Sequence, residues 1–194
     1  MPTATYRLQL NHRFGFFRVG EVAGYLKKLG ISHLYLSPYL RSVKGSPHGY
    51  NIADYLQVNP ELGGTEGHAC MCRNLSDKNL GQVIDIVPNH MGVKGRENRM
   101  WWDVLLKGRA SRYAFYFDID WEVADPKFYG KVLLPVLGDH YGRCLNAGQI
   151  QLRREGTRFL VAYYEHEMPV SRETAADLLQ SAGSSAESRL PAPA

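Results

Sequence analysis

The sequence predicts an α/β fold whose first part is built on parallel strands. Strand-like and helix-like patterns alternate over residues 1–92 in the order strand, helix, strand, helix, strand. The segments between successive strands are long enough for crossover connections, which join parallel strands. The first strand-to-helix turn lacks the Gly-x-Gly-x-x-Gly phosphate motif, which counts against a dinucleotide-binding sheet. Three strands could form only part of a barrel, since a complete barrel takes about 250 residues.

The elements of this first part follow from residue type and spacing. Ala4–Leu10 is rich in strand formers, and Ile31–Ser37 is a short apolar run that Pro38 stops, as expected of a buried strand. Between them, one apolar helix face is predicted, with Gly30 ending the helix. The residues of that face, at three- and four-residue steps, are Val19, Val22, Ala23, Leu26 and Leu29.

A second helix and a third strand complete the predicted parallel unit. A long polar loop is expected from Pro38 to Gly64, rich in Ser, Pro, Gly and Tyr. Thr65 could cap a helix of about a dozen residues that Gly81 closes, although its apolar pattern is poor. Gln82–Val87 is the predicted third strand, which Pro88 ends.

After Met91 the pattern changes to clustered aromatic residues and short strand-like pieces. The predicted strands are Lys131–Val136, Gln149–Leu152 and Phe159–Tyr164, which suggests an irregular antiparallel insertion. The aromatic residues from Trp101 to Trp121 could form a sugar platform or the core of this insertion, and we favour the core for most of them. We therefore expect barrel-type units over residues 1–92, an insertion over 93–180 and a disordered tail over 181–194.

Composition excludes several classes of protein. The 194 residues are 44% hydrophobic and 22% charged, and the net charge of +4 is scattered, so no nucleic-acid-binding stripe is predicted. No apolar run approaches the roughly 20 residues of a membrane span. Three cysteines fit neither a disulfide framework nor a four-cysteine zinc site, so free thiols and a cytoplasmic location are expected. Isolated ligand candidates such as His166 and Asn89 are too few for zinc or calcium, so no metal or other cofactor is expected.

Polar residues gather where the second and third predicted strands end. These are His48, Tyr50, Asn51 and Asp54 after the second strand, and Asp85, Asn89 and His90 after the third. Ligands bind at the carboxyl ends of parallel strands, and an aromatic face with imidazole and carboxylate groups suits a polyhydroxylated ligand. The alternative is that Asp85 and Asn89 only tie loops together.

Two motifs resemble conserved regions of the α-amylase superfamily. Asp85-Ile-Val-Pro-Asn-His90 resembles the region on its third barrel strand, and Ser46-Pro-His-Gly-Tyr50 resembles the substrate-binding loop after strand two. Longer stretches narrow the resemblance to the maltooligosyltrehalose synthase family, within glycoside hydrolase family 13. They are Thr5–Leu10, Leu29–Pro38, Asn59–Gly64, Tyr116–Trp121 and Lys131–Gly138. The likeness runs from about Ala4 to Leu179 and covers the family's N-terminal part.

The resemblance implies an incomplete (β/α)8 TIM barrel with three strands and two helices, followed by the insertion. It also implies an intramolecular transglucosylation, in which the reducing-end α-1,4 bond of a maltooligosaccharide becomes the α,α-1,1 bond of trehalose. By resemblance, His48, Tyr50 and His90 line the subsite for the glucose that changes bonds, while Asp85 and Asn89 organise the strand end. Asn51 stands where the family usually has Asp.

The family's nucleophile, acid/base and third carboxylate follow its fourth, fifth and seventh strands. We therefore expect no catalytic residue among these 194 and no activity of the chain alone. The expected partner is the maltooligosaccharide, with no nucleic acid and no membrane, and a separately encoded remainder of the barrel could associate with the chain. The alternatives are a truncated maltodextrin-binding fragment and a fragment of an amylase-type hydrolase.

Overall fold

The computed structural model describes residues 1–187, with side chains through residue 180. The chain divides into two compact units, Met1–Asn98 and Arg99–Ala194, which are described separately below. The boundary that the sequence suggested, between residues 92 and 93, falls a few residues before this division. The assignment of the two ranges to barrel and insertion remains a prediction.

A parallel three-stranded sheet forms the centre of the first unit. Strand β2 (His33–Leu36) pairs in parallel with β1 (Thr5–Leu8) on one side and with β5 (Gly81–Ile84) on the other. Helix α1 (Phe16–Lys28) joins β1 to β2, and helix α2 (Gly64–Asp77) precedes β5, so the crossover order of a (β/α) unit is present. The first helix and the three strands are present where they were predicted, although each strand is shorter, at Thr5–Leu8, His33–Leu36 and Gly81–Ile84. Gly81 belongs to β5 rather than closing α2, which ends at Asp77.

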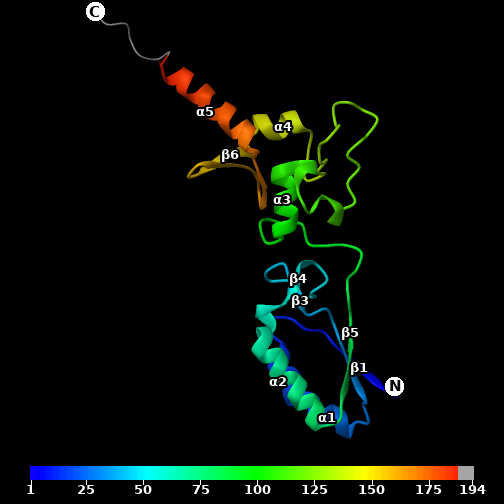
Figure 1. Cartoon of the computed structure of the whole chain (residues 1–194). Coiled ribbons are helices and arrows are strands. Elements are labelled where there is room, and N and C mark those ends of the chain that lie inside the picture. The colour runs from blue at the N-terminus through cyan, green and yellow to red at the C-terminus, as the bar shows by residue number, and fades with distance from the viewer. Residues whose placement is uncertain (188–194) are drawn as a thin grey trace, which may run out of the picture. The chain divides into compact units, whose positions relative to one another are not determined.

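The two helices pack on the same side of this sheet (Figure 1). Leu34 and Leu36 of β2 are fully buried beneath them, and Phe16 of α1 is also fully buried. Since side chains alternate along a strand, Tyr35 points to the opposite face, where Arg7 is its register partner on β1. The sheet thus has one apolar face under the helices and one polar face.

The ends of the two helices follow ordinary backbone rules. Gly30, at φ +89°, donates from its N–H to Lys27, and the N–H of Ile31 reaches Leu26, which is a Schellman motif. Helix α2 begins at Gly64 after the left-handed Gly63, so Thr65 is not its cap. Its weak apolar pattern still provides an inner face, because Gly67, Met71 and Leu75 lie one helical turn apart and are buried.

The prediction of a long loop from Pro38 to Gly64 is wrong, because a β-hairpin occupies much of this segment. Strand β3 (Leu40–Ser42) pairs antiparallel with β4 (Ile52–Val58), with shifts of register along the pair. The 3-10 helix η1 (Pro60–Leu62) follows, and Asn59 accepts the N–H of Glu61 at its start. The frequent Gly, Pro and Ser residues of the segment mask the short strands, and the adjacent residues Ile52 and Ala53 are both buried, which breaks the alternation typical of a strand.

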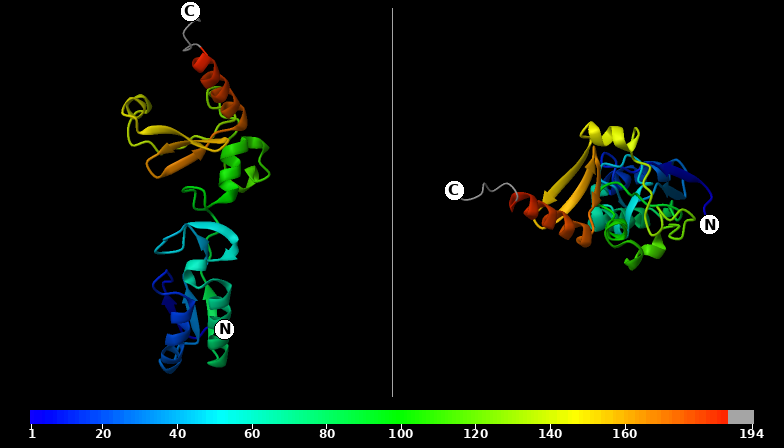
Figure 2. Two further views of the ribbon diagram at one scale, coloured as in Figure 1. Left: turned by 90° about the vertical axis from the view of Figure 1, so that its left-hand side faces the viewer. Right: turned by 90° about the horizontal axis from the view of Figure 1, so that it is seen from above.

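The second unit combines short helices with an antiparallel sheet. Helix α3 (Arg99–Lys107) is followed by the 3-10 helices η2 (Gly108–Ala110) and η3 (Ala114–Tyr116), and then by α4 (Tyr141–Asn146). Strands β6 (Ile150–Glu155), β7 (Arg158–Tyr163) and β8 (His166–Pro169) pair in that order, and α5 (Arg172–Glu187) follows them. Figure 2 shows this sheet as a twisted ribbon of three strands with α4 at one end.

Several expectations for this region need correction. The predicted strands at Gln149–Leu152 and Phe159–Tyr164 correspond to β6 and β7, but no strand forms at Lys131–Val136, where apolar residues alternate poorly around Pro135. The tail predicted from Ser181 begins inside α5, which extends to Glu187, and its last seven residues lie outside the described part. Among the described helices, none has the length and apolar character that a membrane span requires.

Candidate functional site

The polar face of the parallel sheet carries a connected group of four side chains. Arg7 of β1, Tyr35 of β2, Asp85 after β5 and Tyr50 of the loop after β3 make up this group, which we call the Arg7–Asp85 network. Both Tyr35 and Tyr50 donate hydrogen bonds to Oδ2 of Asp85, the first at 3.2 Å. Nη2 of Arg7 donates to the Tyr50 hydroxyl at 2.8 Å and lies 3.6 Å from Oδ2 of Asp85.

The backbone explains why these residues meet. Arg7 and Tyr35 are register partners on adjacent parallel strands, so their side chains leave the same face of the sheet. Asp85 directly follows β5, and its N–H donates to the carbonyl of Leu36 at 3.0 Å, which extends the pairing past the strand end. The network therefore lies at the carboxyl ends of the strands, where ligand sites of parallel α/β folds lie.

The loop before Tyr50 holds its backbone in a tight turn. The N–H of Tyr50 donates to Nδ1 of His48 at 3.0 Å, and the two rings lie 5.9 Å apart at 35°. Gln9, at the end of β1, donates to the carbonyl oxygen of His48 at 3.0 Å. The position of Asn51 is also fixed, because its Oδ1 accepts the Ser46 hydroxyl at 2.5 Å. An Asp at that position could accept the same bond, so the hydrogen bond itself does not require Asn.

Gly49 is the residue that this turn depends on most, and Gly49→Ala should destabilise the first unit. Its φ is +77°, and a Cβ would collide with the carbonyl oxygen of Pro38. The left-handed backbone alone costs a non-glycine residue roughly 1–2 kcal/mol. Gly45→Ala is a matched control, because Gly45 has φ +74° with open space around a Cβ. We expect Gly49→Ala to lower the melting temperature more than Gly45→Ala; equal losses would contradict the collision.

The protonation of Tyr50 is coupled to its partners. The hydrogen bond that Tyr50 donates to Asp85 raises the pKa of its hydroxyl above the usual value, and burial adds to this shift, while Arg7 opposes it. A raised folded-state pKa contributes stability that is complete below the unfolded value of about 10 and is lost as the pH rises through the folded value. Melting temperatures should therefore fall above about pH 10, and less steeply in Tyr50→Phe. Parallel pH profiles of the two proteins would contradict the coupling.

Asn89 and His90 lie in the segment that follows β5, outside the network. Both are exposed, and Nδ1 of His90 lies 3.1 Å from Oδ1 of Asn89. The Tyr55 hydroxyl shares its one proton between the carbonyl oxygens of Val87 and His90, the latter 2.9 Å away, and so holds the backbone of this segment. Among the described contacts, the side chains of Asn89 and His90 meet each other and not Asp85.

The structure thus brings Tyr50 into contact with Asp85 and places His48 beside Tyr50, so these three residues line one polar surface. Arg7 and Tyr35 are the members that sequence reasoning missed. Their signal was present, because polar side chains at matching positions of two parallel strands must share a face. Among the described residues, no group of three His, Cys, Asp or Glu is arranged to hold a metal ion.

Comparison with known proteins identifies the family. The catalytic domain of the α-amylases matches residues 19–142, which is most of the chain. The chain belongs to the α-amylase family. The match includes the strands and loops that carry Tyr50 and Asp85, so the α/β unit described above is a partial TIM-barrel-like fold.

Relatives within this family carry more specific enzyme names. A Mycobacterium tuberculosis protein that carries the name maltooligosyl trehalose synthase is 47% identical over 141 residues, covering 70% of this chain and 18% of that protein. The maltooligosyltrehalose synthase from Arthrobacter ramosus is 44% identical with a TM-score of 0.77, covering 89% of this chain and 22% of that one. A cyclomaltodextrinase of Geobacillus thermopakistaniensis is 37% identical over 95 residues.

The chain therefore resembles the maltooligosyltrehalose synthases over their N-terminal part. It spans about a fifth of the length of these relatives, from 18% of the mycobacterial protein to 22% of the Arthrobacter enzyme.

Proposed function

We propose that this chain is the N-terminal portion of a maltooligosyltrehalose synthase and carries part of its substrate-binding surface. The observation that supports this most strongly is the combination of 44% identity and a TM-score of 0.77 with the Arthrobacter synthase over 89% of the chain. The reaction would convert the reducing-end α-1,4 bond of a maltooligosaccharide into the α,α-1,1 bond of a trehalose terminus.

The contacts of the site residues support a role for each of them. Tyr50 presents a ring held by His48 and Asp85, and a rigid aromatic face is suited to pack against the C–H surface of a glucose ring. His48, Asn89 and His90 are exposed and carry polar atoms that can bond sugar hydroxyls. We assign His48, Tyr50, Asp85, Asn89 and His90 to the substrate-binding site.

Asp85 is assigned to positioning rather than to nucleophilic attack. Retaining glycoside chemistry uses two carboxyl groups about 5 Å apart across the scissile bond. The described partners of Asp85 are Arg7, Tyr35 and Tyr50, and none of them is a carboxyl group. Its Oδ2 already accepts two hydroxyl protons, which orient the carboxylate toward Tyr50. We therefore expect the 194-residue chain to lack turnover by itself.

The remaining assignments concern the second unit, the cellular location and the association of the chain with the rest of a barrel. We assign residues 93–180 to the insertion subdomain that interrupts the barrel, on the basis of the separate antiparallel sheet β6–β8. The three cysteines are free thiols, which suits a reducing cytoplasm. The polar face of the β1–β2–β5 sheet is the face that the rest of a barrel would enclose, so association with a remainder of the barrel is part of the proposal.

A chimera tests the proposal and separates it from an amylase-type hydrolase. The N-terminal part of the Arthrobacter ramosus synthase would be replaced by this chain, and the chimera would be incubated with maltopentaose. Trehalose-terminated product is expected, and it should depend on Tyr50. Release of glucose or maltose without a trehalose terminus would favour the hydrolase. A folded chimera with no turnover would contradict the assignment, with the unmodified synthase as the control for the assay.

A further inference from the structure

The aromatic cluster of the second unit is only partly a core. Trp101 is 7% exposed and packs against Phe117, with ring centroids 4.9 Å apart. By contrast, Phe115 is 97% exposed and Tyr116 is 65% exposed. Within one short segment, Phe117 therefore packs against a buried tryptophan, whereas Phe115 and Tyr116 lie at the surface. The prediction that most of the cluster forms a core agrees with the burial of Trp101, whereas Phe115 and Tyr116 lie outside that core.

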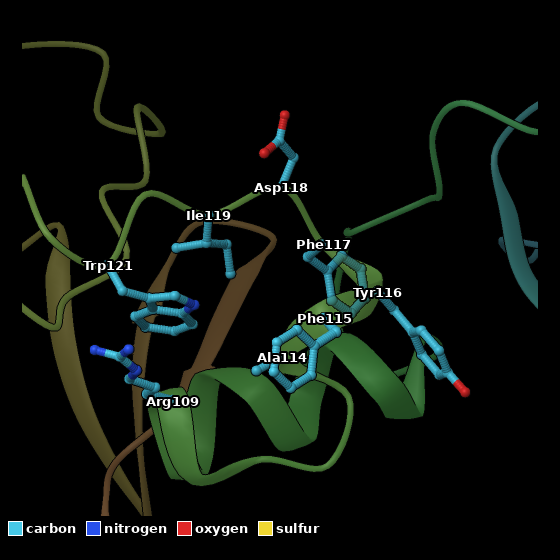
Figure 3. A pocket seen from close by; sticks show the side chains of 8 residues that line it. All are labelled: Arg109, Ala114, Phe115, Tyr116, Phe117, Asp118, Ile119 and Trp121. Carbon is cyan, nitrogen blue, oxygen red and sulfur yellow. The ribbon is translucent and has the colours of Figure 1, made fainter.

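The exposed part of the cluster borders a cavity, the Trp121 pocket, of about 520 Å³. It is lined by Arg109, Ala114, Phe115, Tyr116, Phe117, Asp118, Ile119 and Trp121. In Figure 3 the Trp121 indole and the Phe115 ring stand on opposite sides of the gap, with Ile119 near the gap and Arg109 beside the indole. Its volume falls within the range of about 300–1,000 Å³ that is usual for small-molecule sites.

The walls of this pocket are held in place by local bonds. The N–H groups of Ala114 and Tyr116 donate to Ser111 and Tyr113, each at 3.0 Å, which fixes the turn that carries Phe115. Nη1 of Arg109 donates to Oε1 of Glu122 at 2.9 Å, so the guanidinium is oriented beside Trp121. These bonds hold the backbone that carries Phe115 and orient the Arg109 side chain, so the turn that forms the pocket exists without a ligand.

The chemistry of the Trp121 pocket fits a sugar chain. Two aromatic walls can cover the C–H faces of a pyranose ring, and the donors of Arg109 can bond its hydroxyls. A second cavity of about 360 Å³ also borders Asp118 and Ile119, and it reaches Phe128 and Lys131. The two cavities share these lining residues, which suits an extended oligosaccharide better than a single small molecule.

We propose that the Trp121 pocket is a second α-1,4-glucan site, built entirely from residues of the second unit and sharing none with the Arg7–Asp85 network. This proposal rests on the proposed function, because membership of the α-amylase family and likeness to the synthases indicate an α-glucan as the ligand. The pocket would hold an α-glucan chain that does not undergo bond exchange. It would also explain why Phe115 leaves so large an apolar ring in water.

Titration of the full chain with maltopentaose, followed by calorimetry and by tryptophan fluorescence, tests the proposal. The variants are Phe115→Ala and Trp121→Ala for the pocket, Tyr50→Ala for the first site, and Tyr141→Ala as a matched control. Tyr141 is an exposed aromatic residue of the same unit that does not line the pocket. Phe115 is so exposed that its loss should leave the fold intact, which circular dichroism would verify.

We expect two binding events in the unmodified chain. Phe115→Ala and Trp121→Ala should each weaken one of them by about tenfold or more, while Tyr50→Ala should weaken the other and Tyr141→Ala neither. Trp121→Ala should also abolish the fluorescence change of the second event.

Three other outcomes separate this proposal from the proposed function. If only Tyr50→Ala reduces binding, the second site is overturned and the proposed function stands. If only the pocket variants reduce binding, the second site stands and the role of Tyr50 is contradicted. If Phe115→Ala abolishes self-association of the chain but leaves glucan binding unchanged, the pocket is a protein contact and the proposal is overturned.

Discussion

Replacing Phe16 with alanine is expected to unfold the first unit or nearly so. Phe16 is completely buried and packs edge-on against Tyr39 and His68, with ring centroids 5.6 and 5.4 Å away. Truncating a buried phenylalanine costs about 3–5 kcal/mol, which is comparable to the whole stability of a small domain. Thermal melts followed by circular dichroism would measure the loss.

The neighbouring residue provides a matched control for this experiment. Phe17 lies on the same helix but is 51% exposed, so Phe17→Ala should cost far less. Similar melting temperatures for the two variants would mean that α1 does not pack on the sheet as described. The comparison thus tests the packing of α1 against α2 and β2, on which the position of the strand ends depends.

Replacing Asp85 with asparagine in the chimera is expected to reduce turnover without abolishing it. Asparagine keeps an oxygen that can accept the hydroxyls of Tyr35 and Tyr50, but it loses the charge that faces Arg7. Misplacing a substrate-binding group in this way costs on the order of 100-fold. Loss of a catalytic nucleophile removes about 10⁴- to 10⁶-fold of kcat. Steady-state rates of trehalose-terminus formation would distinguish the two.

Asp139→Asn serves as the control for that substitution. Asp139 is exposed in the second unit, where its Oδ1 faces Arg143 at 3.3 Å and accepts the N–H of His140. Asparagine keeps that oxygen and an exposed ion pair contributes little, so the substitution should leave turnover unchanged. A loss of 10⁴-fold or more in Asp85→Asn would show that Asp85 takes part in the chemistry itself. The assignment of Asp85 to positioning would then be wrong.

The parallel core could be predicted from the sequence because local and long-range signals agree there. The apolar face of α1, Gly30 after it and the buried run before Pro38 each point to the same order of elements, and the structure has that order with a shorter strand, β2, at His33–Leu36. The hairpin of β3 and β4 could not be predicted in the same way. Its pairing joins Leu40 to Val58 across a loop rich in glycine and proline, with irregular register, so no regular alternation marks it.

The candidate site, too, could be predicted from the sequence only in part. Tyr50 and Asp85 were found because they stand within recognisable motifs at strand ends, and the structure brings them into direct contact. Arg7 lies 78 positions from Asp85 in the chain, and only the register of β1 against β2 and of β2 against β5 reveals that they meet. The division of the aromatic cluster at Phe117 and Phe115 likewise depends on tertiary packing, which residue type alone does not encode.

The most direct test of the account is the behaviour of the purified 194-residue chain with maltopentaose, observed by proton NMR. Saturation transfer from the protein to the sugar, reduced in Tyr50→Ala, is predicted, together with unchanged anomeric signals of the α-1,4 bonds over a long incubation. Equal transfer in Tyr50→Ala and the unmodified chain would contradict the substrate-binding assignment. Appearance of an α,α-1,1 anomeric signal would contradict the claim that these residues bind substrate but do not perform the reaction.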